Sequence, residues 1–195
     1  MKFLLPTLLL SVAALPGVAA LPEGELAPTF HAPAALAGKP LDYSLSDALR
    51  RGPVVVYFYP SAFTRGCNLQ AHTFATRLDQ FGAAGATVVG VSLDDVGRLI
   101  DFSADPEYCA GRLPVVSDAD GRIAASYALQ VREAPEGRKD TRGADIRHRL
   151  SERTTFVIGQ DGHIVATLQG LDPVPNVERA LAVVEQLAAR RQATR

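Results

Sequence analysis

An α/β fold, with a mixed central β-sheet flanked by helices, is predicted by three features of the sequence. Apolar, β-branched runs of strand length alternate with segments whose apolar residues have helical spacing. Near the C-terminus, two strand-like runs are joined by a short glycine-rich turn of hairpin type. The composition, 47% hydrophobic and 21% charged over 195 residues, is that of a globular protein with room for one domain and a short extension.

The first twenty residues have the order of a secretory signal peptide. Lys2 is their only charge, residues 3–15 are mostly apolar, and residues 16–20 are small. The apolar stretch is shorter than the roughly 20 residues that span a membrane. We therefore expect a signal peptide over 1–20 and an exported, periplasmic domain over 21–195, with no membrane contact after cleavage. An uncleaved membrane anchor is the alternative.

The first half of this domain predicts strands separated by one long helix. An extended segment over 21–40 leads to a small edge hairpin that includes Lys39–Leu45. Val54–Tyr59 is continuously apolar, as expected of a strand buried on both faces. A helix over 67–81 and a second buried strand over Thr87–Leu93 follow. The helix carries apolar residues on one face and ends at glycines: Phe74, Leu78 and Phe81, then Gly82 and Gly85.

The next segments predict shorter elements and one irregular loop. Asp94 and Asp95 place acidic residues at the start of a helix over 95–104. A short strand over Leu113–Val116 and a short helix over Ile123–Leu129 follow. Residues 132–149 are dense in charge and glycine without a clear period, and we interpret them as a solvated surface loop.

The C-terminal part predicts a hairpin of Thr154–Ile158 and Ile164–Leu168, then a helix that begins at Pro175. The whole order is β-α-β-α-β-α-β-β-α. Its first part implies right-handed crossovers onto parallel strands, and its last part adds an antiparallel edge. This is a thioredoxin-like fold. The net charge of −1 argues against a nucleic-acid partner, which usually requires a basic excess.

Cys67 is the most informative single residue, because it lies where a buried strand gives way to a helix. Helix N-termini carry partial positive charge and free N–H groups, which favour a thiolate over a thiol. We therefore expect Cys67 to be an ionised nucleophile that solvent-borne reagents can reach. A buried or bridged structural cysteine is the alternative.

The residues around Cys67 follow the pattern Pro-x-x-x-Thr-x-x-Cys, from Pro60 through Thr64 to Cys67. This pattern resembles the peroxiredoxins, thiol peroxidases with a thioredoxin fold. Three further segments resemble the same family in the same order: Ser117-Asp118-Ala119-Asp120-Gly121, Arg153-Thr154-Thr155-Phe156-Val157-Ile158 and Asp161-Gly162-His163-Ile164-Val165. The resemblance covers roughly residues 25–190, and the nearest branch is the bacterioferritin-comigratory group.

This resemblance implies a catalytic set of Cys67, Thr64, Arg153, Pro60 and Cys109. Cys67 would attack peroxide and become a sulfenic acid. Arg153 would stabilise the thiolate and donate to peroxide oxygens, Thr64 would contact both thiolate and peroxide, and Pro60 would shield the sulfur from water. Cys109 would then resolve the sulfenic acid as an intramolecular disulfide. No cofactor or metal is expected.

The implied substrates are hydrogen peroxide and organic hydroperoxides, and a thioredoxin-like or other dithiol reductant would regenerate the enzyme. We expect a monomer or a weak dimer. Where relatives often carry a second cysteine, five residues after the first, this chain has His72. Arg65 and Asn68 also depart from the common residues.

Other interpretations of the same residues remain open. A copper-binding chaperone of thioredoxin fold would use Cys67 with His148 or His163 as ligands, although its usual Cys-x-x-x-Cys pair is missing. A disulfide oxidoreductase would need a Cys-x-x-Cys pair, which is also missing. A non-catalytic domain would be bridged by Cys67 and Cys109. Arg153 alone could be a surface arginine, and the four histidines are expected to face solvent or bond locally.

Overall fold

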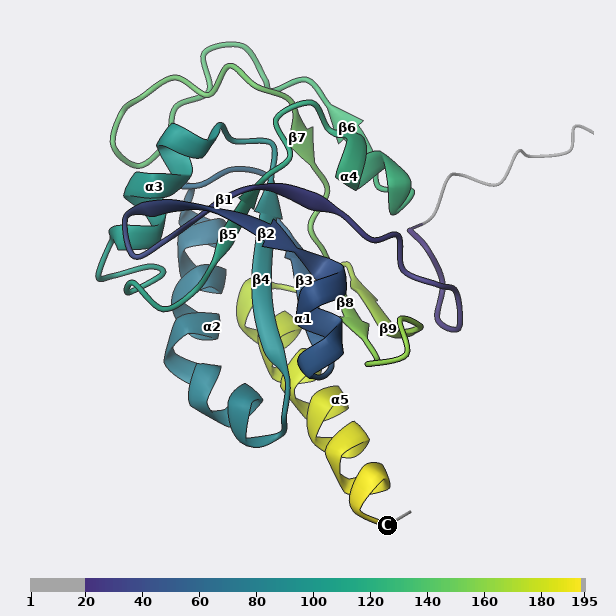
Figure 1. Ribbon diagram of the computed structural model, residues 1–195. Helices are drawn as coiled ribbons and strands as arrows, with labels where there is room; N and C mark the ends of the chain where they lie inside the picture. Colours follow the sequence, from purple (N-terminus) through teal and green to yellow (C-terminus); the bar gives the residue numbers. More distant parts are fainter. Residues whose placement is uncertain (1–19, 194–195) are drawn as a thin grey trace, which may run out of the picture.

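The computed structural model describes residues 20–193, which form one seven-stranded mixed sheet and a small two-stranded sheet (Figure 1). The order in the large sheet is β2-β1-β5-β4-β3-β8-β9, and β6 pairs with β7. The strands are β1 (His31–Leu36), β2 (Lys39–Ser44), β3 (Val54–Phe58), β4 (Thr87–Ser92), β5 (Val115–Ser117), β6 (Val131–Arg132), β7 (Leu150–Ser151), β8 (Thr154–Ile158) and β9 (Ile164–Gln169). The helices are α1 (Leu45–Arg51), α2 (Arg65–Ala83), α3 (Val96–Ala104), α4 (Arg122–Ser126) and α5 (Pro173–Ala193).

The centre of the large sheet is parallel and its flanks are antiparallel. β3 pairs in parallel with β4, and β4 with β5. β1 and β8 each pair antiparallel with this parallel core, and β2 and β9 close the two hairpins. The prediction of a mixed sheet flanked by helices, in a thioredoxin-like fold, is confirmed.

Both faces of the sheet are apolar and both are covered, which explains the continuous apolar sequence of β3. Val55 and Tyr57 belong to a buried cluster with side chains of α2, α3 and α5. Val54, Val56 and Phe58 point to the other face, where they join buried residues of α1 and α4. Successive side chains of a strand alternate between faces, so a strand between two helical layers is apolar at every position. Figure 1 shows α2, α3 and α5 on one side of the sheet and α1 on the other.

Several boundaries differ from the predictions. α1 was not predicted; it follows directly on β2 and has three buried residues at helical spacing, Leu45, Ala48 and Leu49. α2 begins at Arg65 rather than at residue 67, and α5 begins at Pro173 rather than at Pro175. The predicted loop over 132–149 is closed at its base by the pairing of β6 and β7. No helix within residues 20–193 is long and apolar enough to cross a membrane.

The two edges of the large sheet are protected in different ways. The edge strand β2 carries Lys39 and Pro40 at its start. At the other edge, residues 21–27 run along β9, where the Gly24 N–H donates to the Ile164 carbonyl at 2.8 Å and the Ile164 N–H donates to the Glu25 carbonyl at 2.8 Å.

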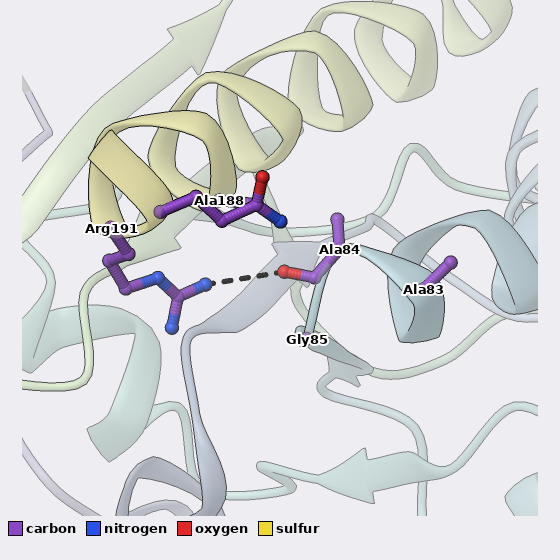
Figure 2. Close-up of a pocket in the computed structure, with 6 residues that line it drawn as sticks. Ala83, Ala84, Gly85, Ala188 and Arg191 are labelled. Atoms are coloured by element: carbon purple, nitrogen blue, oxygen red, sulfur yellow. Dashed lines mark hydrogen bonds between the residues drawn. The ribbon is translucent and has the colours of Figure 1, made fainter. Parts of the chain in front are cut away.

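A shallow pocket of about 200 Å³ lies where the C-terminal ends of α2 and α5 meet (Figure 2). There the Arg191 guanidinium donates to the Ala84 carbonyl at 3.2 Å. This contact ties the last turn of α5 to the residue that ends α2. The pocket is at the opposite end of α2 from Cys67 and holds none of the predicted site residues.

Candidate active site

The sheet topology brings most of the predicted site residues to one edge. Parallel strands end at the same edge, so the residues that follow β3 lie beside those that follow β4. β8 runs antiparallel to β3 and starts at that edge, where Thr154 pairs with Phe58. Pro60, two residues after β3, and Arg153, immediately before β8, therefore lie at the edge of the sheet where α2 starts. Ligands of open α/β sheets bind outside the carboxyl ends of the strands in the same way.

Cys67 is the third residue of α2 and lies in its first turn. Thr64 is the N-cap residue, and the first α-helical hydrogen bond runs from the Asn68 N–H to the Thr64 carbonyl at 2.8 Å. The N–H groups ahead of it have no partner within the helix and concentrate positive potential around the sulfur. Cys67 is only 2% exposed, so little of it faces solvent, and its reaction with solvent-borne reagents stays a prediction.

Arg153 reaches the sulfur directly. Its Nη2 donates to Cys67 Sγ at 3.4 Å, which brings the two most important predicted residues together. Gly66 permits this approach, because a Cβ atom at that position would lie 3.2 Å from Arg153 Nη2. The guanidinium is half-buried and carries a permanent charge. The site therefore holds a fixed cation against the thiol.

A chain of buried amides holds the arginine in place. Arg153 Nη1 donates to Gln70 Oε1, and Gln70 Nε2 donates to Asn176 Oδ1 at 3.1 Å. Thr155 Oγ1 donates to the same Asn176 oxygen at 2.7 Å. Gln70 and Asn176 are fully buried. Gln70 belongs to the sequence motif, but its role was not predicted, and nothing in the local sequence of α5 marks Asn176.

The turn from Ser61 to Thr64 connects β3 to α2 and is anchored on Asp94. Ser61 Oγ donates to Asp94 Oδ1 at 3.0 Å, and the Ala62 N–H donates to Asp94 Oδ2 at 2.7 Å. Thr64 was predicted to contact the thiolate, but in this conformation its hydroxyl donates to the Ser61 carbonyl at 2.8 Å. Phe63 has a φ of 57°, which is uncommon for a bulky residue.

Asp94 is the centre of an ionic cluster that sequence reasoning missed. It is paired with Arg98 Nε and with His148 Nε2, each at 2.8 Å, and Arg98 Nη2 continues to Asp140 Oδ2 at 2.7 Å. The carboxylates of Asp94 and Asp140 are fully buried. The prediction that the histidines face solvent or bond locally is therefore wrong for His148, and the predicted solvated loop over 132–149 contributes a buried aspartate.

The pKa values of this cluster are displaced in opposite directions. Burial alone would raise the pKa of Asp94, but the hydrogen bond and charge of His148 hold it below its usual value. Burial alone would lower the pKa of His148, but the hydrogen bond and charge of Asp94 raise it. Burial also works against ionisation of Asp140, yet the Ala144 N–H and Arg98 keep its pKa low. Each partner therefore favours the charged form of the other, carboxylate for Asp94 and imidazolium for His148.

Cys109 lies in the turns that follow α3 and is fully buried. Burial raises the pKa of its thiol, and the charge of Asp105 adds to this effect. The segment is held against α2 by two contacts, His72 Nδ1 with the Glu107 carbonyl at 2.8 Å and an ion pair of Arg112 with Asp79. Both cysteines are free, although they belong to the same apolar cluster.

Fold and site together define a class of protein. A thioredoxin-like fold that holds a thiol in the first turn of a helix, against an arginine from the neighbouring strand, is built for thiol-based redox chemistry. Within residues 20–193, no three histidine, cysteine or acidic side chains are arranged to hold a metal ion.

Comparison with known proteins identifies the family. The model of the AhpC/TSA family matches residues 24–167. A peroxiredoxin of Mycobacterium tuberculosis is 35% identical over 145 residues, which are 74% of this chain and 83% of that protein. Peroxiredoxin Bcp of Xanthomonas campestris is 28% identical over 132 residues, 68% of this chain and 76% of that one.

A solved structure agrees with these relatives. The crystal structure of peroxidoxin BcpB from Mycobacterium tuberculosis has a TM-score of 0.70 and 28% identity, and the match covers 85% of this chain and 97% of that one. The chain belongs to the AhpC/TSA family and is a peroxiredoxin of the bacterioferritin-comigratory type. Its function is thiol peroxidase, and the copper-binding and non-catalytic alternatives are not favoured.

Proposed function

We propose that Cys67 is the peroxide-reducing thiol and that Arg153 is its electrostatic partner. The 3.4 Å contact between Arg153 Nη2 and Cys67 Sγ carries this proposal. The thiolate attacks one peroxide oxygen, the O–O bond breaks, and the other oxygen leaves as an alkoxide or hydroxide that takes up a proton. Cys67 becomes a sulfenic acid and the peroxide becomes an alcohol or water. Arg153 and the N–H groups of the first helical turn stabilise the developing negative charge.

Thr64 and Pro60 have supporting roles in this proposal. Thr64 caps α2, and its hydroxyl can turn from the Ser61 carbonyl toward a bound peroxide. Pro60 presents a ring without an N–H at the same edge of the sheet, which limits water around the sulfur. Because Cys67 is only 2% exposed, access to its sulfur favours hydrogen peroxide and small organic hydroperoxides over bulky ones.

Cys109 is proposed to resolve the sulfenic acid. Its sulfur attacks the Cys67 sulfur, a disulfide forms and water leaves. A buried, protonated thiol is a poor nucleophile, so the turns over residues 105–113 must first open. Ala110 and Gly111, both with left-handed φ values, lie beside Cys109 in this segment. A thioredoxin-like or other external dithiol would then reduce the disulfide.

Export and assembly are also part of this proposal. Residues 1–20 have the charge and hydropathy order of a signal peptide, which supports a periplasmic enzyme. We infer that the mature protein is a monomer or a weak dimer. Determination of the N-terminal residue of protein recovered from the periplasm tests the first statement. Sedimentation over a range of concentrations tests the second.

Two cysteine variants test the chemistry. One equivalent of peroxide should convert the wild-type protein to an intramolecular disulfide, seen as the loss of two hydrogens by intact mass and of both free thiols. Cys109→Ser should stop at a Cys67 sulfenic acid, one oxygen heavier, after a single round. Cys67→Ser should consume no peroxide. Undiminished turnover in Cys67→Ser would refute the proposed function, and a disulfide between two chains would refute only the intramolecular route.

A further inference from the structure

The Ser61 to Thr64 turn ends the connection from β3 to α2, so its shape sets where α2 begins. We propose that His148 and Asp94 are positioning residues that hold this turn, and through it Cys67, in the geometry that reacts with peroxide. The inference rests on the proposed function of Cys67. It makes the charged loop over 132–149 a working part of the active site.

Asp94 and Arg98 both hydrogen-bond to the backbone of Ala62, one at its N–H and the other at its carbonyl. The Ala62 N–H donates to Asp94 Oδ2 at 2.7 Å, and Arg98 Nη2 donates to the Ala62 carbonyl at 2.9 Å. The Ser61 hydroxyl adds a third contact to Asp94 at 3.0 Å. Ser92 Oγ, at the end of β4, donates to Asp94 Oδ2 at 2.7 Å and fixes the carboxylate on the sheet. Through Asp94, these contacts fix the position of the turn relative to the central sheet.

The backbone conformation of Phe63 explains why the turn needs these contacts. Its left-handed φ of 57° is unfavourable for a residue with a bulky side chain and persists only when the surroundings enforce it. The loop over 132–149 holds Phe63 in this conformation. The Thr141 N–H and hydroxyl both donate to the Phe63 carbonyl at 2.8 Å, and the Arg142 guanidinium lies 3.3 Å from the centre of the Phe63 ring. Arg98 binds the neighbouring Asp140 and joins the loop to Asp94.

His148 completes the cluster as an imidazolium. Its Nδ1 is 2.7 Å from the Arg149 carbonyl, and its Nε2 is 2.8 Å from Asp94 Oδ1. Both partners accept hydrogen bonds, so both ring nitrogens must carry a proton, and a neutral ring could satisfy only one. Two charged side chains face the His148 ring. The negative charge of Asp94 favours protonation of the ring and the positive charge of Arg98 opposes it, while Asp140 lies on the far side of Arg98. Loss of the proton at higher pH would loosen the turn.

The arrangement is not a serine-nucleophile triad. Ser61 Oγ lies 3.2 Å from His148 Nε2, the same nitrogen that contacts Asp94, and the other nitrogen faces a backbone carbonyl. A triad needs the hydroxyl and the carboxylate on opposite ring nitrogens. The histidine therefore acts on the turn through Asp94 rather than on a substrate.

The test compares His148→Ala and His148→Gln with wild type across pH. Gln can donate to Asp94 but does not titrate, and Ala does neither. The readout is the second-order rate of Cys67 oxidation by hydrogen peroxide, measured by rapid quench with an alkylating reagent. His163→Ala is the matched control, because that histidine pairs with Asp161 in the β8–β9 turn and not with the active-site turn.

Below the His148 pKa, we expect His148→Ala to react roughly tenfold or more slowly than wild type, since small misplacements of reacting groups cost up to about a hundredfold. The ratio of wild-type to variant rate should fall toward one as pH rises through that pKa. His148→Gln should retain most of the rate below the His148 pKa. Because its amide keeps donating to Asp94 at every pH, it should react faster than wild type above that pKa, so the ratio of wild type to His148→Gln should fall below one as pH rises. His163→Ala should match wild type at every pH.

The outcomes separate this inference from the proposed function. If wild-type Cys67 does not react with peroxide, the proposed function fails and the inference fails with it. If wild type reacts but the His148→Ala ratio stays near one, or stays constant with pH, only the inference is overturned. If His148→Ala does not fold, the pH dependence of the ratio of wild type to His148→Gln decides, and a flat ratio overturns the inference.

Discussion

Gly66→Ala should slow peroxide reduction without destabilising the protein. The added Cβ would lie 3.2 Å from Arg153 Nη2, so the guanidinium must withdraw by a few tenths of an ångström from a sulfur that it now contacts at 3.4 Å. A charge-assisted hydrogen bond contributes about 1.5–3 kcal/mol. Loss of roughly half of it raises the barrier by about 1 kcal/mol, which is about a fivefold lower rate. Gly66 is helical, and Ala is favoured over Gly in helices by up to about 1 kcal/mol.

The assay pairs the rate of Cys67 oxidation by hydrogen peroxide with the free energy of unfolding in urea. Gly82→Ala is the matched control, because Gly82 lies on the same helix and a Cβ there meets nothing within 4 Å. It should gain stability and keep the wild-type rate. A Gly66→Ala variant that reacts as fast as wild type, or a control that slows equally, would refute the reasoning about Arg153.

Three further predictions concern the ionic cluster and the second thiol. Arg98→Met should lower the free energy of unfolding by about 3 kcal/mol, because it removes the cation that the buried carboxylates of Asp94 and Asp140 share and leaves them only His148 and Arg142. In wild type, the lowered pKa values of these carboxylates stabilise the fold above about pH 4, and this stability is lost as pH falls through them. The raised pKa of His148 stabilises the fold below about pH 6.5, and this contribution is lost as pH rises through it. Urea unfolding should therefore give maximal stability from this cluster between those limits. Tyr108→Ala should speed disulfide formation about tenfold, because it removes two ring contacts that hold the Cys109 segment closed.

Controls for these three predictions come from the same chain. Arg50→Ala removes an exposed ion pair with Asp47 and should cost less than about 0.5 kcal/mol. His148→Gln should flatten the alkaline side of the stability profile only. Tyr43→Ala removes a ring contact remote from Cys109 and should leave the disulfide rate unchanged. If Arg98→Met lowers the free energy of unfolding by less than about 1 kcal/mol, solvent must screen the charges of the cluster and the reasoning is refuted.

The parts of the fold that follow a local pattern could be predicted from the sequence. β3 is apolar at every position because both of its faces are covered, and α2 shows its buried face at helical spacing. α1 was missed because its seven residues follow β2 without a break and offer a single buried turn. Its pattern is too short to be distinguished from the end of a hairpin.

In the candidate site, too, only the residues that a local sequence pattern marks could be predicted. Cys67 and Arg153 were predicted because each lies in a distinctive segment, and the structure brings them into contact. The environment of Asp94 could not be predicted, since an Asp-Asp pair before a helix is equally consistent with two solvated caps. Asp95 is such a cap and accepts from the Arg98 N–H at 2.9 Å. Asp94 is buried because the Ser61 to Thr64 turn and His148 of a distant loop both pack against it, and these are tertiary contacts without a local signal.

The two protected edges of the large sheet, at β2 and β9, limit how a second molecule can contact this one. Lysine and proline make β2 a poor template for strand addition, because proline lacks a donor and charge resists a dry contact. At the start of β9, the Ile164 N–H and carbonyl are already paired with Gly24 and Glu25. Both features disfavour extension of the large sheet by a strand from a second chain at these positions. Contacts between helices and loops do not meet this restriction.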